Sequence, residues 1–331
     1  MKHRTDINIL LLILAFGWAV TGTALCESRL LVVHKWGDSL GVYSSNTGEQ
    51  LGTIPVGKVP HELALSVDHK LAYVTEYGVR SYTEESEGGN TISIIDLQSL
   101  SQTGVIDLGK YHRPHGILMG KSGRLYVTVD FPPALLVIDP EERRIERQYE
   151  LDQSLPHMVA VFSDESRAYT ANSGSGTISV IDLNLEKTIS TIPIGGVPMG
   201  FALTRDNSRL FASNRTGDSV ALIDTGTNSI VRMIRLEGQP ARLLLTQNDD
   251  LLLVSLHEAG DVAVIDTKTL EAVGRFHAGF NVEGMNVDEQ AGFGYVSAQG
   301  DDKIVKFSLG DWKVRLQIET GARPDPIQLL H

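Results

Sequence analysis

From residue 29 onward, apolar residues occur in short runs that alternate with polar residues, and turn-forming residues separate the runs. After Pro156 the runs read HMVAVF, RAYTAN, TISVIDL and KTISTIPIG, with SDES, SGSG and NLE between them. A period of two residues, enrichment in Val, Ile, Thr and Tyr, and polar turns between the runs are typical of β-strands. This stretch is therefore predicted to form four consecutive strands.

The four-run unit repeats along the chain with a spacing of 42 residues. The units are marked by Pro114, Pro156, Pro198 and Pro240, and the same step reaches Val282 and Pro324. Pro60 lies 54 residues before Pro114, and an insertion of 12 residues at 78–89 accounts for the longer step. Four strands in a unit of this length are typical of a β-propeller blade.

The two ends of the chain are predicted to complete the ring. Residues 29–57 match the last three strands of a unit, and residues 323–331 match a lone first strand. We therefore predict an all-β fold: a seven-bladed β-propeller with four-stranded antiparallel blades, closed by the N-terminal strands plus the C-terminal strand, so that no sheet edge is left open. Residues 27–331 are expected to form this single domain, with blades at 27–59 plus 324–331, 60–113, 114–155, 156–197, 198–239, 240–281 and 282–323.

Residues 1–26 are predicted to be a signal peptide. Lys2 and Arg4 precede the apolar run INILLLILAFGWAV, which is short for a membrane span, and small residues follow it. The mature protein is expected to be extracytoplasmic, in the periplasm, on the cell surface or secreted, with no membrane span after cleavage. Cys26 is the only cysteine, which rules out an internal disulfide. A lipid anchor at Cys26 is the less favoured alternative, because Leu25 stands where a lipobox requires a small residue.

The charge balance bears on the choice of partner. The chain has 29 basic and 41 acidic side chains and a formal net charge of −12. A nucleic-acid binder would need a basic face, so nucleic acid is not expected as a partner. We expect a monomer that binds a small-molecule ligand or a protein partner.

The second strands of the units share a four-letter word, which reads LVVH, YVTE, YVTV, YTAN, FASN, LVSL and YVSA. With the repeat proline and the VID-like end of the third strand, these words resemble the YVTN-repeat β-propeller family, found in secreted and surface-layer-type prokaryotic proteins. The resemblance covers essentially residues 29–331. The family and its relatives include ligand-binding modules, adhesive surface proteins, lactonase-like and lyase-like enzymes and propellers attached to redox machinery. It therefore implies the fold and leaves the function open.

Function is expected where the repeat is broken, because positions common to all blades serve the common fold. In a propeller, the residue after the repeat proline and the fourth residue of the second-strand word both approach the mouth of the central channel. Three consecutive blades carry a histidine at the first position, and the first two blades carry His34 and Glu76 at the second. The predicted metal ligands are His34, His61, His115 and His157.

Imidazole and carboxylate groups together suit a divalent transition metal, namely zinc, copper, iron, nickel or manganese. In such a site Glu76 is expected to be a ligand or a general base. The alternative is that these histidines only form hydrogen bonds with the loops of neighbouring blades, in which case no cofactor is expected.

Further departures from the repeat lie near the same mouth. Arg242 replaces a small residue, and it is expected to orient an anionic substrate through paired hydrogen bonds or to pair with Glu283. Trp36 and Tyr77 follow second strands and are expected to wall the entrance as substrate-binding residues. The insertion at 78–89 is predicted to emerge beside the site, either as a binding element or lid or as a plain surface loop.

Three functions follow from these patterns. The first is a secreted or periplasmic propeller that binds a ligand or metal at the channel mouth. The second is a metal-dependent enzyme of lyase, lactonase or oxidase type, with Glu76 and Arg242 as catalytic residues. The third is a structural surface protein or partner-binding scaffold. The sequence lacks a G-x-S-x-G nucleophile elbow, a phosphate-binding glycine loop and a C-x-x-C-H haem attachment motif. His257, in the loop after another second strand, is expected to face solvent.

Overall fold

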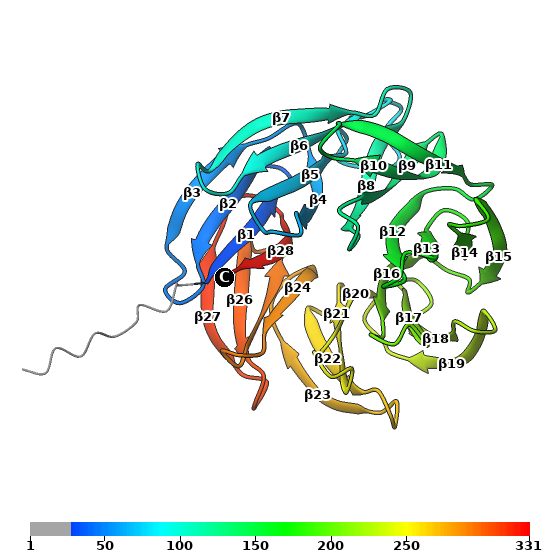
Figure 1. The fold of residues 1–331 in the computed structure, drawn as a ribbon. Coiled ribbons are helices and arrows are strands. Elements are labelled where there is room, and N and C mark those ends of the chain that lie inside the picture. Colours follow the sequence, from blue (N-terminus) through cyan, green and yellow to red (C-terminus); the bar gives the residue numbers. More distant parts are fainter. Residues whose placement is uncertain (1–27) are drawn as a thin grey trace, which may run out of the picture.

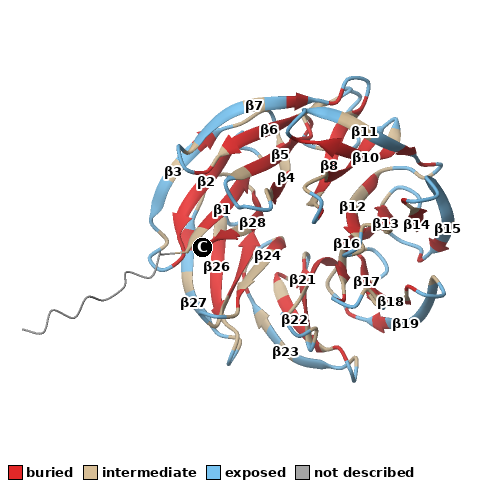
Figure 2. Ribbon diagram, viewed as in Figure 1, coloured by how far each residue is buried: buried red, intermediate tan, exposed pale blue. Residues whose placement is uncertain are grey.

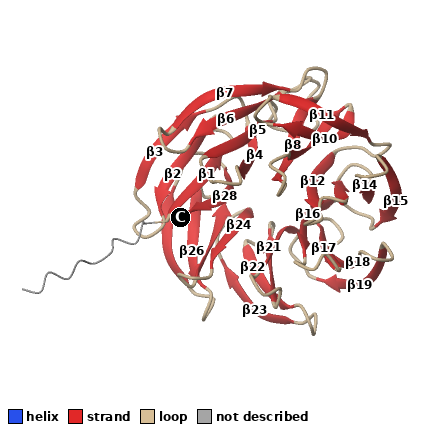
Figure 3. Cartoon of the chain, viewed as in Figure 1, coloured by secondary structure: helices blue, strands red, loops and turns tan. Residues whose placement is uncertain are grey.

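The computed structural model describes residues 28–331, which form seven four-stranded sheets arranged in a ring (Figure 1). All strand pairings within the sheets are antiparallel, and strands are the only regular elements in this part of the chain (Figure 3). The predicted seven-bladed β-propeller is therefore confirmed. The predicted signal peptide at 1–26 lies outside the described residues. Between residues 28 and 331, no helix has the length and apolar character needed to cross a bilayer.

Each blade runs from an inner strand at the central channel to an outer strand at the periphery of the ring. The first three blades contain β28 (Pro324–Leu330), β1 (Arg29–His34), β2 (Ser39–Ser44) and β3 (Gln50–Pro55); β4 (Pro60–Leu65), β5 (Leu71–Glu76), β6 (Thr91–Asp96) and β7 (Ser101–Asp107); and β8 (His112–Met119), β9 (Leu125–Phe131), β10 (Pro133–Asp139) and β11 (Arg144–Glu150). The next two contain β12 (Pro156–Val161), β13 (Arg167–Asn172), β14 (Thr177–Asp182) and β15 (Lys187–Pro193); and β16 (Pro198–Leu203), β17 (Arg209–Asn214), β18 (Ser219–Asp224) and β19 (Ser229–Arg235). The last two contain β20 (Pro240–Leu245), β21 (Leu251–Leu256), β22 (Asp261–Asp266) and β23 (Ala272–His277); and β24 (Val282–Asp288), β25 (Phe293–Ala298), β26 (Lys303–Ser308) and β27 (Val314–Glu319).

The ring closes through the first blade, as the sequence predicts. The C-terminal strand β28 pairs antiparallel with β1, so the two ends of the colour scale meet in one sheet (Figure 1). Arg29 pairs with Leu330 and Val32 with Ile327. Because β28 takes the innermost position that the N-terminal segment lacks, this blade has the same four strands as the others.

The apolar core lies between neighbouring blades. Inner and middle strands are largely buried, whereas the outer strands are exposed along most of their length (Figure 2). In one such core, Val180 of the fourth blade packs with Leu210 and Ala221 of the fifth. Each large apolar side chain removed from water in this way contributes about 1.5–3 kcal/mol. Packing of blade against blade therefore fixes the angular position of each inner strand around the channel.

A β-bulge follows the repeat proline, or the residue equivalent to it, in every inner strand. In β4 the pairing moves from Pro60↔Glu76 to Leu63↔Val74, so β4 has one more residue than β5 over this interval. A bulge leaves the extra residue out of the ladder and re-aims the local side chains. The bulges therefore determine which side chains reach the channel mouth.

Candidate functional site

The channel mouth holds a cavity of about 580 Å³, a volume typical of small-molecule sites. Bulge residues of the inner strands form its floor, and loops that follow the second strands form its wall. The residues contributed by the bulges are His61, His115, His157, Met199, Arg242, Glu283 and Asp325. The cavity is therefore built from the positions at which the seven repeats differ.

The imidazole rings of three consecutive blades stack on one another at this floor. The His115 ring centroid lies 3.8 Å from the centroids of both His61 and His157, with interplanar angles of 46° and 39°. The His61 and His157 centroids are 6.4 Å apart. Neighbouring rings are thus stacked closely but tilted relative to one another. The structure brings together three of the four histidines predicted as metal ligands.

These imidazoles are neutral near pH 7. Burial lowers the pKa of His61, His115 and His157 well below the ordinary value, and the positive charge of Arg242 adds to the effect. The Nδ1 of His157 donates a hydrogen bond to the carbonyl of Met199 at 3.0 Å, which leaves Nε2 as the atom with a free lone pair. The buried Nδ1 atoms of His61 and His115 have no hydrogen-bond partner among the described residues. A neutral imidazole with a free nitrogen is the form that binds metals.

Glu62 follows His61 within the same bulge, and its carboxylate lies close to His61 and His115. One carboxylate oxygen of Glu62 and one ring nitrogen each of His61 and His115 lie within 4.8 Å of one another. Arg242 donates a short hydrogen bond to Glu62 Oε1 and lies 3.4 Å from Asp325 Oδ2. Burial and the nearby Asp325 raise the pKa of Glu62 to about 7, although Arg242 opposes this shift. The second carboxylate oxygen of Glu62 has no partner among the described residues.

A second charged group lies on the far side of the floor. Glu283 pairs with Arg215, and its Oε1 lies 2.7 Å from His257 Nδ1. The expectation that His257 faces solvent is wrong, because this contact with Glu283 and a contact of 2.9 Å with the Asn281 amide hold the ring in the cavity wall. Against the effect of burial, Arg215 and His257 lower the pKa of Glu283 well below its ordinary value. Arg242 lies 3.9 Å from Glu283, so its strongest partner is Glu62 and not Glu283.

Tyr77 and Asp130 form a hydrogen-bonded pair beside the histidines. The Tyr77 hydroxyl donates to Asp130 Oδ2 at 2.5 Å, and its ring centroid lies 5.2 Å from that of His61 and 5.4 Å from that of His115. Burial raises the pKa of Asp130 to about 6, although Tyr77 and Arg113 act in the opposite direction. Burial and Asp130 raise the pKa of Tyr77 above its ordinary value. Tyr77 therefore lines the cavity as expected for an entrance residue, and its hydroxyl is held by the carboxyl group of Asp130.

The structure does not bring His34 to the other histidines. His34 Nδ1 lies 3.0 Å from the Ser39 hydroxyl and Nε2 lies 2.9 Å from the Tyr43 hydroxyl, so both nitrogens have partners. The physical reason lies in the register, since His34 pairs with Pro324, the residue before the bulge. Directly paired residues project on the same face of a sheet, and the bulge residue that follows does not.

Glu76 is likewise separated from the cavity, for the same reason. It pairs with Pro60 and accepts hydrogen bonds from the Gly57 amide at 2.9 Å and from the hydroxyls of Thr91 and Ser93. These contacts hold the carboxylate between β6 of its own blade and the loop that leads into β4. Neither a ligand role nor a catalytic role is therefore available to Glu76 in this arrangement, and Glu62 is the carboxylate that accompanies the histidines.

The insertion at 78–89 forms part of the cavity wall and is firmly attached. Its residues 79–82 line the cavity beside Trp36, whose side chain is 44% exposed. The buried guanidinium of Arg113 donates to the carbonyls of Tyr82 at 3.0 Å and Glu84 at 2.5 Å, and also to that of Ser86. One side chain from the neighbouring blade thus ties the insertion down along its length.

Two residues near the histidines, Glu62 and Asp130, were not among the predicted site residues, and only Glu62 has a recognisable signal in the sequence. Glu62 occupies the same repeat position as Arg242, two residues after the proline, and both positions hold glycine in three other blades. A charged residue at each of two opposite blades of the ring indicates an ion pair across the channel. Asp130 gives no such signal, since it follows the second-strand word by one residue in a single blade.

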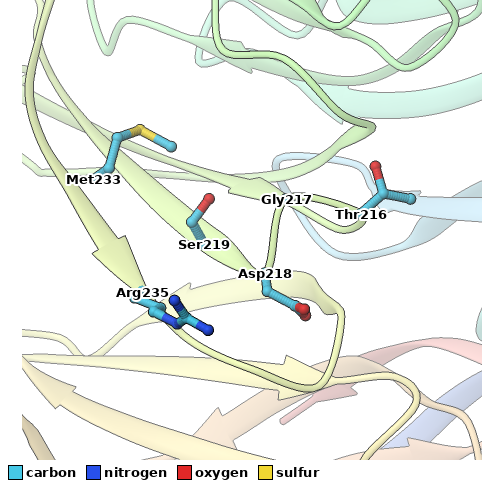
Figure 4. Close-up of a pocket in the computed structure, with 6 residues that line it drawn as sticks. All are labelled: Thr216, Gly217, Asp218, Ser219, Met233 and Arg235. Carbon is cyan, nitrogen blue, oxygen red and sulfur yellow. The ribbon is translucent and has the colours of Figure 1, made fainter.

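A second, shallower hollow lies at the edge of the fifth blade (Figure 4). It has a volume of about 380 Å³ and is lined by Thr216, Gly217, Asp218, Ser219, Met233 and Arg235. Its lining contains one acidic and one basic side chain and no histidine. The chemistry-bearing side chains are therefore concentrated at the channel mouth.

No protein-family model matches the chain, and no curated protein matches it by sequence. Solved structures match it in fold. The hydrazine synthase of Kuenenia stuttgartiensis is 17% identical, with a TM-score of 0.73 over 85% of this chain and 92% of that one. A functionally unknown protein from Desulfotomaculum acetoxidans DSM 771 is 15% identical, with a TM-score of 0.77 over 92% and 99% of the two chains. The periplasmic gluconolactonase PpgL of Pseudomonas aeruginosa is 14% identical, with a TM-score of 0.74 over 92% and 99%. These similarities show the propeller fold alone.

Proposed function

We propose that this propeller binds one divalent transition metal at its channel mouth, through the imidazoles of His61, His115 and His157. Glu62 is the candidate fourth ligand, through the oxygen that Arg242 does not contact. The stacking of three neutral imidazoles from three blades, with buried nitrogens left without partners, is the observation that carries the proposal.

The geometry of three of the four proposed ligands is close to what an ion requires. Metal–nitrogen bonds of about 2.0–2.1 Å place ligand atoms at most about 4.2 Å apart. The ligand atoms of His61, Glu62 and His115 already lie within 4.8 Å of one another, so movements of less than 1 Å complete that set. The hydrogen bond from His157 Nδ1 to the Met199 carbonyl and the pairing of Glu62 with Arg242 are outer-shell contacts that orient ligands.

A buried nitrogen or oxygen without a partner costs about 1–3 kcal/mol, and metal binding would offset this cost at His61 and His115. The donor set of nitrogens with a carboxylate favours zinc, copper, nickel or iron over calcium or magnesium. Arg242 and Arg215 weaken any cation site at this floor, but Glu62, Glu283 and Asp325 balance their charge.

The test is a titration of chelator-treated protein with Zn²⁺, Cu²⁺, Ni²⁺, Mn²⁺ and Fe²⁺, followed by calorimetry and by elemental analysis after desalting. We expect one ion per chain and, at a free metal concentration 100 times Kd, about 2.7 kcal/mol of added stability. His115→Gln and His157→Gln should each weaken the affinity by more than about 100-fold, beyond the range for an outer-shell residue.

His257→Gln is the matched control, because His257 lines the same cavity but is held by Glu283. It should bind metal as tightly as the wild type, within a few-fold. A wild type that takes up no stoichiometric metal from this series, or equal affinities in the wild type and in His115→Gln, would refute the proposal.

An enzymatic function is a second candidate, and the Tyr77–Asp130 pair beside the histidines is the observation that favours it. A carboxyl group with a pKa of about 6 is suited to general acid–base work near neutral pH. We propose metal-dependent chemistry of lactonase, lyase or oxidase type, with Asp130 and Tyr77 in place of Glu76. If metal-loaded protein hydrolyses a panel of lactones, Asp130→Asn should abolish turnover while leaving metal content unchanged; if Asp130→Asn retains full turnover, this assignment fails.

We also propose an extracytoplasmic location for the mature protein, on the basis of the basic and apolar N-terminal segment. N-terminal sequencing of protein recovered from the periplasm or the medium should begin near residue 25. Recovery of the chain in the cytoplasm with Met1 retained would contradict this location. We likewise propose that the protein belongs to the YVTN-repeat family and that it is a monomer.

A further inference from the structure

The cavity at the channel mouth is locally basic although the chain as a whole is acidic. Its charged lining consists of Lys35, Arg80, Arg215, Arg242 and Arg323 against Asp130, Glu283 and Asp325. The three stacked histidines are neutral, as described above. The lining thus has an excess of basic over acidic side chains, in a protein with a formal net charge of −12. An excess of positive charge in a concave site concentrates anions.

The basic residues fall into two classes. On the floor, Arg242 and Arg215 are paired with carboxylates, and Lys35 lies 3.8 Å from Asp325. At the rim, the guanidinium groups of Arg80 and Arg323 have no carboxylate within ion-pair distance among residues 28–331. The free positive charge of the cavity therefore lies at the rim.

Both rim arginines lie over the same aromatic ring. The guanidinium carbon of Arg323 is 4.8 Å from the centroid of the Trp36 ring, and that of Arg80 is 5.2 Å from it. Stacking on an aromatic ring leaves the in-plane N–H groups of a guanidinium free to donate, and these groups match carboxylate and phosphate oxygens in pairs. Trp36 thus orients two sets of donors at the cavity entrance.

The insertion that carries Arg80 is held in place. Its backbone amides at Arg80 and Ser81 donate to Glu84 Oε1 at 2.7 and 2.9 Å. Arg113 fixes the following carbonyls from the neighbouring blade, as described above. Because the segment is tied at both places, Arg80 is presented at the rim with a small loss of conformational entropy on binding.

We propose that Arg80, Arg323 and Trp36 form a binding site for the anionic group of a small organic ligand, a carboxylate or a phosphate, whose remaining part extends over the stacked histidines. This inference rests on the proposed metal site only for what lies at the far end of the ligand. Arg242, which the sequence suggested for this role, is occupied by Glu62 and Asp325. The selectivity for anions therefore comes from the rim.

The first test uses Trp36 as its own reporter. The chain has three tryptophans, and Trp18 lies in the predicted signal peptide, so Trp312→Phe leaves Trp36 as the sole emitter of the mature protein. Iodide, an anionic quencher, should quench Trp36 more strongly than neutral acrylamide predicts. Adding Arg80→Gln and Arg323→Gln should reduce the iodide constant about two-fold or more and leave the acrylamide constant unchanged. Arg315→Gln, at an arginine paired with Asp311 on the outer strand β27, is the control and should change neither.

The second test measures ligand binding by the same emission at constant ionic strength. Succinate, its neutral diamide and inorganic phosphate are titrated into metal-free and metal-loaded protein. Saturable binding of succinate or of phosphate, weakened about 10-fold or more in the Arg80→Gln, Arg323→Gln variant, supports the proposal and tells which anion is preferred. The diamide should give no saturable response.

The outcomes separate this site from the metal site. Anion binding by a protein that takes up no metal leaves the rim site intact and removes the proposed metal function. Metal uptake with no saturable response to either anion overturns the rim site and leaves the metal proposal standing. Equal anion affinity in the wild type and the double variant also overturns it.

Discussion

The folded protein should lose stability steeply on acidification below pH 6.5, because four buried imidazoles stay neutral in the fold. Burial lowers the pKa of His34 to about 4 and that of His61, His115 and His157 well below 6.5. In the unfolded chain each imidazole binds a proton near pH 6.5. Unfolding therefore takes up protons in this range, and the free energy of unfolding falls as the pH falls.

The size of the effect follows from the groups that titrate. Each imidazole contributes about 1.4 kcal/mol per pH unit below 6.5. Glu62 and Asp130 oppose it, because their pKa values in the fold are raised to about 7 and about 6, so the folded protein binds these protons first. Four imidazoles against two carboxyl groups leave a net difference of two protons, or about 2.7 kcal/mol, between pH 6 and pH 5. That is a large part of a typical stability of about 5–15 kcal/mol.

The sign is also set by the charges around the histidines. Lys35, Arg242 and Arg215 lie close enough to disfavour an imidazolium, while Glu283 favours one at His157. Basic groups outweigh this carboxylate, so protonation of the stacked rings is opposed by both burial and charge.

The assay is urea unfolding followed by circular dichroism at pH 7, 6 and 5, with a chelator present. His115→Gln should reduce the pH dependence by about one proton, to roughly half of the wild-type slope between pH 6 and 5. His69→Asn, at an exposed histidine far from the cavity, is the control and should keep the wild-type slope. A wild type whose stability does not change between pH 7 and 5, or an unchanged slope in His115→Gln, would show that these rings are not neutral in the fold.

Three further changes test the structural assignments. Glu76→Ala removes the acceptor of three hydrogen bonds and should lower the free energy of unfolding in urea by about 3 kcal/mol. The metal affinity measured by calorimetry should stay at the wild-type value. A loss of metal affinity without a loss of stability would restore Glu76 as a ligand. Arg113→Met should release the insertion, seen as at least about a 10-fold faster hydrogen exchange of amides in 79–86, and unchanged exchange there would show that other contacts hold it. Deletion of residues 324–331 removes β28 and should expose the edge of β1, so that size-exclusion chromatography shows aggregates; a monomeric, cooperatively unfolding product would contradict the role of ring closure.

Much of the fold could be predicted from the sequence because the same local pattern of strands and turns occurs in all seven blades. Each unit shows strand-length apolar runs with turns between them, and the two partial units at the ends add up to one blade. The repeat proline also marks the start of five of the seven inner strands, namely β4, β12, β16, β20 and β28. The sequence likewise identified the residue after the proline as a channel position, which led to His61, His115 and His157.

The sequence could not tell which way the fourth residue of the second-strand word projects. His34 and Glu76 were grouped with the histidines because both approach the mouth along the chain. Their direct pairing with Pro324 and Pro60 instead turns them away from the stacked histidines, and hydroxyl groups of the neighbouring strand form hydrogen bonds with them.

The sequence by itself determined the number of blades, the strands within them and the ring closure, because periodicity and turn chemistry are local properties of the chain. The tertiary structure decided which side chains meet. The bulge after each repeat proline puts two adjacent residues at the channel, which explains why Glu62 accompanies His61. Ring closure then brings Arg242 to Glu62 across 180 residues of chain, a pairing that depends on the positions of blades and not on spacing in the sequence.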